Sequence, residues 1–180
     1  MGFEMLASRY LNPYFGNGIG AWAGLISVVL CGLAVGYFVG GIIADRNPSP
    51  YFISYAVASA ALYLAVVPPT ADPMMRWIQY VLGEGPSGIL VAATALLQIP
   101  LTLLGTLSPM AVRVLLPSTD RIGRVSGRLY AVSTIGNVSG TLITTFVLVP
   151  QIGSRKITYL FAGLLGCSAI SLFLCARKAR

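Results

Sequence analysis

The sequence contains no histidine and few charged residues. Its 180 residues include 12 Lys and Arg and 5 Asp and Glu, so only 9% are charged, whereas a soluble domain carries about 25%. The lack of histidine removes the commonest general base and metal ligand. Because 56% of the residues are hydrophobic and the mean hydropathy is +0.81, polar side chains are too few to cover a globular surface. We therefore expect lipid to be the solvent of this chain.

Motifs for chemistry are also missing. The sequence has no phosphate loop, GxGxxG cradle, nucleophile elbow or zinc-ligand spacing. Cys31, Cys167 and Cys175 lie in apolar runs without a CxxC pair, which favours small packing residues over a disulfide or a metal site. We predict no catalytic, cofactor-binding or metal-binding residues, and no enzyme. The net charge of +7 is better explained by membrane topology than by nucleic-acid binding, because the cations lie between and after the apolar runs.

Five apolar runs are long enough to cross a membrane, which takes about 20 residues. They predict one transmembrane domain over 1–180, an all-α polytopic protein with five full spans and a partial N-terminal helix. Residues 2–15 are too short and too polar to cross alone, so they form either an interfacial helix or the end of a first span whose beginning is missing. The spans are predicted at 20–43, 51–69, 88–112, 129–151 and 157–176.

A further short helix, over about 72–83, is expected to lie on the membrane surface. Asp72 suits an N-cap, Pro73 suits the first helical position, and Gly83 suits a helix end. Trp77 fits the headgroup level. A lid over a ligand is the alternative interpretation.

Glycines indicate where helices pack closely. Gly32, Gly36 and Gly40 recur every four residues and share one helix face, which lets a second helix approach within a membrane. Gly136 and Gly140 are predicted to do the same in the fourth span. The small hydroxyl residues around them more often join helices than line a pathway.

The Lys and Arg residues divide unequally between the two sides of this topology. The richer side is expected to be cytoplasmic, which puts the C-terminus inside. The poorer side carries Arg9, Arg76, Arg155 and Lys156, and the richer side carries Arg46, Arg113, Arg121, Arg124, Arg128, Arg177, Lys178 and Arg180.

The first span ends in Asp45-Arg46, and a loop over 113–128 is rich in arginine. These arginines suit anionic lipid headgroups, an acidic partner, or a latch with Asp45 across the cytoplasmic face, and plain positive-inside anchoring is the simplest alternative. The cations of the loop are Arg113, Arg121, Arg124 and Arg128.

Polar residues inside the predicted spans are sparse. Gln98, which precedes Pro100, and Asn137 are candidates for an intramembrane polar site, and Glu4 joins them if the first helix is longer. No Asp, Glu, Lys or Arg lies at mid-depth in the five clear spans, which argues against a proton-coupled carrier or a carrier of charged substrates.

Four segments carry a resemblance to a known family: 2–16, 32–46, 107–113 and 127–155. In order and in motif they resemble the membrane domain of bacterial spermidine-synthase-like fused proteins, a domain related to the major facilitator superfamily. The resemblance implies a half-facilitator bundle in the bacterial inner membrane. Nothing in the chain matches the family's synthase domain, with its nucleotide-binding loop and catalytic aspartates.

Two functions follow as hypotheses. One is a non-catalytic anchor, scaffold or accessory subunit, whose partners would be membrane lipid and other membrane subunits or a separately encoded synthase-like protein. The other is a half-size carrier that acts as a homodimer for a small solute such as a polyamine. An enzyme is the weakest alternative, since no acid–base pair lies within the membrane, and neither hypothesis involves a cofactor or nucleic acid.

Overall fold

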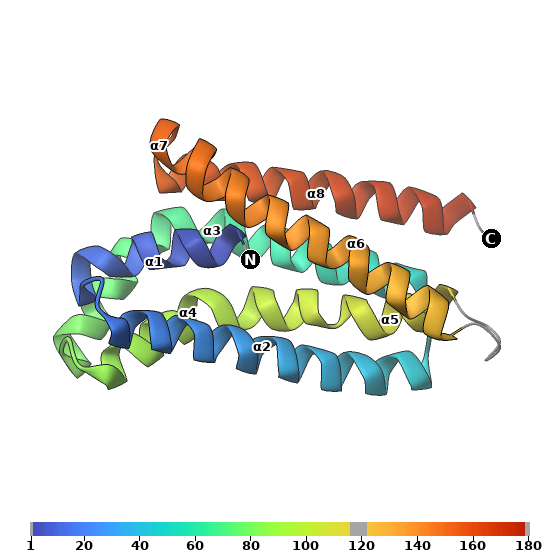
Figure 1. Ribbon diagram of the computed structural model, residues 1–180, viewed down its shortest axis with the longest axis horizontal. Coiled ribbons are helices and arrows are strands. Elements are labelled where there is room, and N and C mark those ends of the chain that lie inside the picture. The colour runs from blue at the N-terminus through green and yellow to red at the C-terminus, as the bar shows by residue number, and fades with distance from the viewer. Residues whose placement is uncertain (1, 116–121, 179–180) are drawn as a thin grey trace.

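The chain is an elongated bundle of helices in this computed structural model (Figure 1). The structure describes residues 2–115 and 122–178, and within those ranges it contains no strand. Five helical segments are long and apolar enough to span a membrane, which confirms the predicted all-α polytopic fold. The elements are α1 Gly2–Phe15, α2 Ile19–Arg46, α3 Pro50–Leu82, α4 Pro86–Gly105, α5 Leu107–Leu115, α6 Ile122–Leu142, the π-helix η2 Ile143–Leu148, α7 Val149–Gln151 and α8 Ser154–Lys178.

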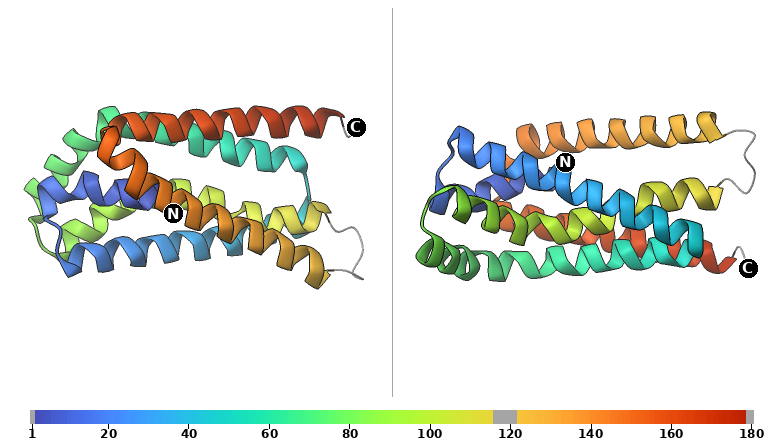
Figure 2. Two further views of the ribbon diagram at one scale, coloured as in Figure 1. Left: turned by 45° about the horizontal axis from the view of Figure 1, so that its top comes forward. Right: turned by 90° about the horizontal axis from the view of Figure 1, so that it is seen from below.

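The long helices run up and down one common axis (Figure 2). Along the bundle, α2 packs on α4 and α3 packs on α8. The turns after α1, α3 and α7 lie together at one end, which we name the Gly153 end. The α2–α3 turn and the last turn of α8 lie at the opposite end, the Asn47 end. The two predicted groups of loops are therefore at opposite ends of the molecule.

The short helix α1 lies inside the bundle. It starts midway along the long axis and runs to the Gly153 end (Figure 1). Leu6, Ala7 and Leu11 have no exposed surface, and α1 contacts α2, α3, α4 and α8. The helix predicted at 2–15 is therefore present. Its apolar side is covered by other helices, while Arg9, Asn12 and Pro13 are exposed.

The predicted break in the helix after the second span is wrong. A span at 51–69 and a surface helix at 72–83 were expected, but α3 is one helix of 33 residues. At 1.5 Å per residue this is about 50 Å, longer than the roughly 30 Å hydrocarbon core. The ribbon bends in its second half (Figure 2).

Packing explains why α3 continues through prolines that ordinarily end or kink a helix. Pro68 is itself buried, and the residues that follow on the same side contact other helices. Burial of this second half offsets the backbone hydrogen bonds that the prolines remove, and kinks at proline account for the bend. The buried residues after the expected break are Ala71, Met75 and Ile78.

The third predicted span, 88–112, is divided at Thr106 into α4 and α5. The interruption falls at the close contact between Gly105 and Gly36, and Pro100 lies within α4 without ending it. The fourth and fifth predicted spans correspond to α6–η2–α7 and α8. The helix α6 begins at residue 122, seven residues before the predicted start at 129.

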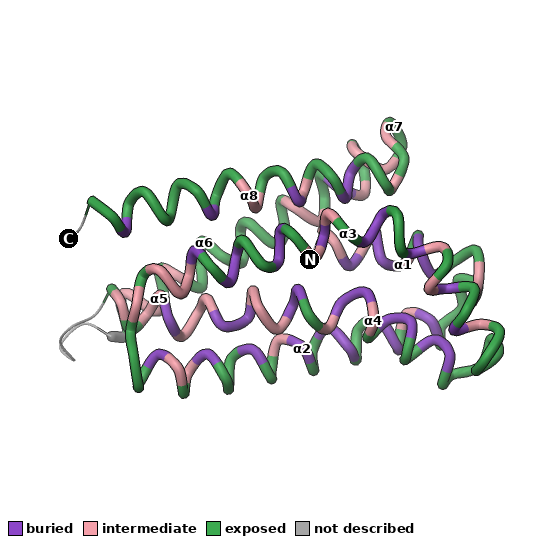
Figure 3. The backbone as a smooth tube through the Cα atoms, turned by 180° about the vertical axis from the view of Figure 1, so that it is seen from behind, coloured by how far each residue is buried: buried purple, intermediate pink, exposed green. Residues whose placement is uncertain are grey.

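Burial is uneven among the helices. Buried residues concentrate in α1, α2, α3 and α4, whereas α8 is mostly exposed (Figure 3). In the most apolar stretch of each span, 50% of Pro86–Leu115 is buried but only 6% of Gly123–Gln151. The α6 segment therefore lies against the bundle without being enclosed by it.

Candidate functional site

The predicted glycine face of α2 lies at the seam with α4 and α5. Gly32, Gly36 and Gly40 are all buried. A Cβ on Gly36 would lie 2.5 Å from the Thr102 carbonyl oxygen, and one on Gly40 would lie 2.6 Å from the Thr106 Cα. Backbone therefore meets backbone along this seam, and only glycine fits at these positions.

Gly136 and Gly140 are placed differently. A Cβ added to either would have no neighbour within 4 Å, although a Cβ on Gly2 of α1 would lie 3.3 Å from the Gly140 carbonyl oxygen. The close packing seen at Gly36 is therefore not found at these two positions, and their packing role stays a prediction.

Gln98 belongs to the α2–α4 seam. Its Nε2 donates to Thr102 Oγ1 at 3.4 Å, and Thr102 Oγ1 donates to the Gly32 carbonyl at 3.3 Å. The side chain is half-buried. The bond that crosses to α2 is therefore made by Thr102, whereas Gln98 bonds within α4, and Gln98 points to no cavity described for the chain.

Asn137 is the middle residue of the Gly123–Gln151 span, with 14 residues on either side. It is exposed, and its side-chain amide has no hydrogen-bond partner among the described residues. Together with Ser133, Ser108 and Tyr37 it borders a cavity of about 280 Å³ between α6 and the α2–α4–α5 seam. An unpaired amide at mid-depth is costly in lipid.

Glu4 is 8% exposed within α1, and it is the one buried carboxylate among the described residues. No ion pair or hydrogen bond of its side chain is found in the described part of the chain. It does not border the cavities at Arg9 or Asn137.

The proposed Asp45 latch is not formed among the described residues. Asp45 and Arg46 are exposed at the end of α2, and no ion pair joins Asp45 to an arginine in the described ranges. Arg121 lies outside the described residues. The remaining arginines of that loop, Arg113, Arg124 and Arg128, are exposed.

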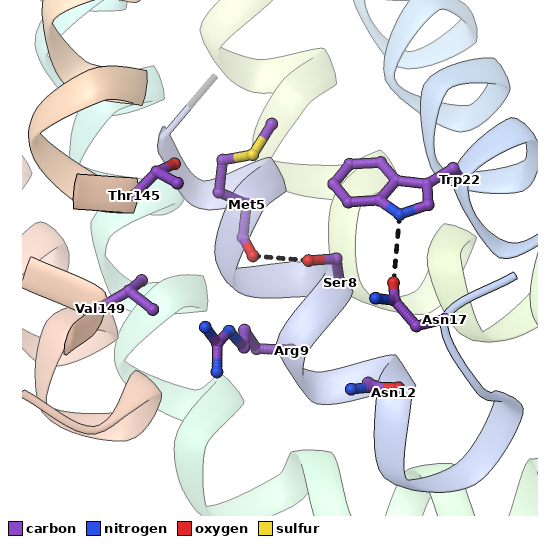
Figure 4. Close-up of a pocket in the computed structure, with 8 residues that line it drawn as sticks. All are labelled: Met5, Ser8, Arg9, Asn12, Asn17, Trp22, Thr145 and Val149. Carbon is purple, nitrogen blue, oxygen red and sulfur yellow. Dashed lines mark hydrogen bonds between the residues drawn. The ribbon is translucent and has the colours of Figure 1, made fainter. Parts of the chain in front are cut away.

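A polar cavity that the sequence did not indicate lies between α1, the start of α2 and the η2–α7 segment (Figure 4). Its volume is about 410 Å³, within the usual range for small-molecule sites. The Arg9 guanidinium faces it from α1, and Trp22 Nε1 donates to Asn17 Oδ1 at 3.1 Å on the opposite wall (Figure 4). The cavity is bordered by Met5, Ser8, Arg9, Asn12, Asn17, Trp22, Thr145 and Val149.

One wall of this cavity comes from the π-helix η2. The Val149 N–H bonds to the Thr144 carbonyl, five residues back, and Pro150 follows without an N–H of its own. A π turn just before this proline changes the register of the helix. The Thr144 and Thr145 hydroxyls are buried without a partner among the described residues, and Thr145 lines the cavity. Single π turns of this kind are frequent at functional sites.

Polar contacts tie α1 and α3 to the start of α8. Tyr10 Oη and Thr158 Oγ1 are 3.0 Å apart and buried, and Arg155 donates to the Asp72 carboxylate. These contacts hold the Arg9 segment beside α8.

The lining can bind polar groups but carries little acid–base chemistry. One cation, two amides, an indole and the hydroxyls of Ser8 and Thr145 surround the space, and no carboxylate borders it. In the described residues, no three His, Cys, Asp or Glu side chains gather as they would around a metal ion.

This site was not predicted from the sequence, because residues 2–15 were interpreted as an interfacial helix or as the end of a first span. Arg9, Asn12 and Asn17 are dense polar residues in an otherwise apolar half of the chain, and this density was the available signal. No feature of the sequence besides Pro150 indicated that η2 would form a wall of this cavity.

No family model, curated protein or solved structure matched the chain when it was compared with them.

Proposed function

We propose that this chain is a non-catalytic, multi-pass membrane subunit that anchors or supports another membrane protein through α6. The observation that carries the proposal is the exposed middle of α6. Only 6% of the most apolar stretch of its span is buried, yet its central residue is the unpaired Asn137.

Lipid tails offer no hydrogen bond to an amide, whereas a neighbouring helix does. Gly136 and Gly140 leave open space beside Asn137, and Asn137 is exposed at the border of the cavity between α6 and the α2–α4–α5 seam. A partner helix that enters this open space can therefore bring its backbone or side chains to that amide. The Ser and Thr hydroxyls of α6 alone would be weaker support for a partner helix. Some of them bond to their own helix, as Thr141 does to the Asn137 carbonyl at 2.9 Å.

The partner we propose is a distinct membrane subunit or a membrane-bound synthase-like protein, in line with the family resemblance of the sequence. We further propose the bacterial inner membrane as its location, with the Asn47 end in the cytoplasm. The support for this orientation is the excess of Lys and Arg at that end.

Native mass spectrometry of the full chain, released from its own membrane in mild detergent, tests the assembly. We expect a stoichiometric heteromeric complex in the wild type. Asn137→Leu should weaken it by about 3- to 30-fold, because an interhelical hydrogen bond in a membrane contributes about 0.6–2 kcal/mol.

The matched control is Ser59→Leu, an exposed polar residue of α3 away from α6, which should leave the complex intact. A monomer that binds no protein, or equal losses in the two variants, would contradict an assembly role for α6.

A carrier is the second candidate, favoured by the two polar cavities. A dimer formed through α6 would cover the open side of the cavity at Asn137, which lies between α6 and the α2–α4–α5 seam of each copy. The lining at Arg9 is cationic and neither cavity has a carboxylate in its wall, so a neutral or anionic solute fits better than the polyamine expected from sequence. A homodimer with saturable uptake into liposomes would favour this function over the accessory subunit.

A further inference from the structure

Another cavity, at the Gly153 end, is lined by three cations and one carboxylate. Its volume is about 320 Å³, and it is separated from the Arg9 cavity described above by the Arg9 side chain, which borders both. Its walls come from α1, α3 and the first turn of α8. The residues that line it are Arg9, Tyr10, Pro13, Asp72, Gly153, Ser154, Arg155 and Lys156.

The charge around this cavity is unbalanced. Asp72 forms an ion pair with Arg155. Arg9 and Lys156 are exposed and have no ion-pair partner among the described residues. Two positive charges therefore remain at the cavity without a counter-charge from the described chain.

The rest of the wall suits an anion as well. The first turn of α8 contributes Ser154 and the positive end of the helix dipole, which favours negative charge nearby. Tyr10 is 6% exposed and is held by its contact with Thr158, so the floor is rigid. Arginine is well matched to phosphate oxygens and lysine supplies a point charge.

The position of the cavity at the end of the spans corresponds to the level expected for lipid headgroups. It lies at the turn where α8 begins, at one end of five helices long enough to span a membrane. Phosphate groups of lipids and of water-soluble phosphates both occur at this level.

We propose that Arg9, Arg155 and Lys156 form a binding site for a phosphate group. Arg9 and Lys156 contact the anion directly from opposite walls, and Arg155 adds a third contact for which the anion competes with Asp72. This site is independent of the assembly role of α6, which centres on Asn137, midway along its span.

The test uses the full chain in a maltoside detergent, which carries no phosphate. Phosphatidylglycerol is compared with diacylglycerol of the same acyl chains by native mass spectrometry, and inorganic phosphate is titrated by calorimetry. We expect one phosphate-bearing ligand per chain, and about tenfold weaker binding in Arg9→Gln and in Lys156→Gln. Asp72→Asn should bind more tightly, because the competing carboxylate charge is gone.

Arg76→Gln is the matched control, an exposed arginine of α3 that does not line the cavity, and it should bind as the wild type does. Binding of the lipid alone identifies a headgroup site, and binding of inorganic phosphate with the same residue dependence identifies a site for soluble phosphate. Should Arg9→Gln fail to fold, Arg9→Lys and Lys156→Gln still test the site. Absence of both ligands from the wild type, or equal weakening in Arg76→Gln, overturns the proposal.

Discussion

At the scale of single residues, Gly36 lies directly against the backbone of Thr102 and Gly105. The neighbours are backbone atoms, so they cannot move aside as a flexible side chain would. Sequence spacing alone located this face, because a repeat of four residues returns to the same side of a helix.

Gly36→Ala should therefore lower the free energy of unfolding by about 1–3 kcal/mol, the usual effect of overpacking. Gly41→Ala is the matched control, since a Cβ there would meet nothing within 4 Å. Reversible unfolding in mixed detergent micelles measures both variants. Equal stability of the two would mean that the seam is not closely packed.

The buried pair of Tyr10 and Thr158 is the second residue-scale prediction. Tyr10→Phe removes one hydrogen bond at 3.0 Å, while Thr158 keeps its bond to the Ser154 carbonyl. The expected loss is about 0.5–1.5 kcal/mol in the free energy of unfolding. Tyr80→Phe, at an 89% exposed position, should cause no change, and a comparable loss there would argue that hydroxyl removal acts nonspecifically.

At the scale of elements, proline has different consequences in α3 and η2. In α3 the helix continues through Pro68, Pro69 and Pro73, and before Pro150 the helix adopts a π turn. Local rules predict a stop at the first site and give no warning of the second. Contacts from distant segments decide both outcomes, which a single sequence does not reveal.

Pro69→Ala should raise the free energy of unfolding, by up to about 3 kcal/mol, because it restores an N–H donor and removes a ring clash. Pro69 is exposed, so it loses no packing. Pro68→Ala should gain less, since Pro68 is buried and the smaller side chain leaves a void. Unfolding in mixed micelles compares the stability of the two variants. A larger increase in stability for Pro68→Ala than for Pro69→Ala would contradict the buried packing of Pro68.

The predicted spans succeeded where hydropathy determines the outcome and failed where packing does. All five spans are present, while α1 was not recognised as a core helix. Its polar residues, such as Arg9 and Asn12, resemble a surface segment. They are exposed and also border a cavity, and only the three-dimensional arrangement makes that cavity visible.

At the scale of the whole molecule, the two ends of the bundle differ in charge. Lys and Arg are more numerous at the Asn47 end, which supports a cytoplasmic position for that end. Fluorescent-protein and alkaline-phosphatase fusions check the orientation. A fluorescent protein placed after Lys178 should fluoresce, and alkaline phosphatase inserted between Gly83 and Gly85 should be active. The reverse pattern would invert the topology.

The contact between Tyr10 and Thr158 joins segments that are 148 residues apart. A ribosome adds about 5–20 residues per second, so α1 emerges roughly 7–30 s before its partner on α8 exists. During that interval the Arg9 segment has no completed wall to rest against. Closure of the bundle around α1 is therefore a late event of biogenesis, and chains arrested before α8 should leave their N-terminal helix open to proteases.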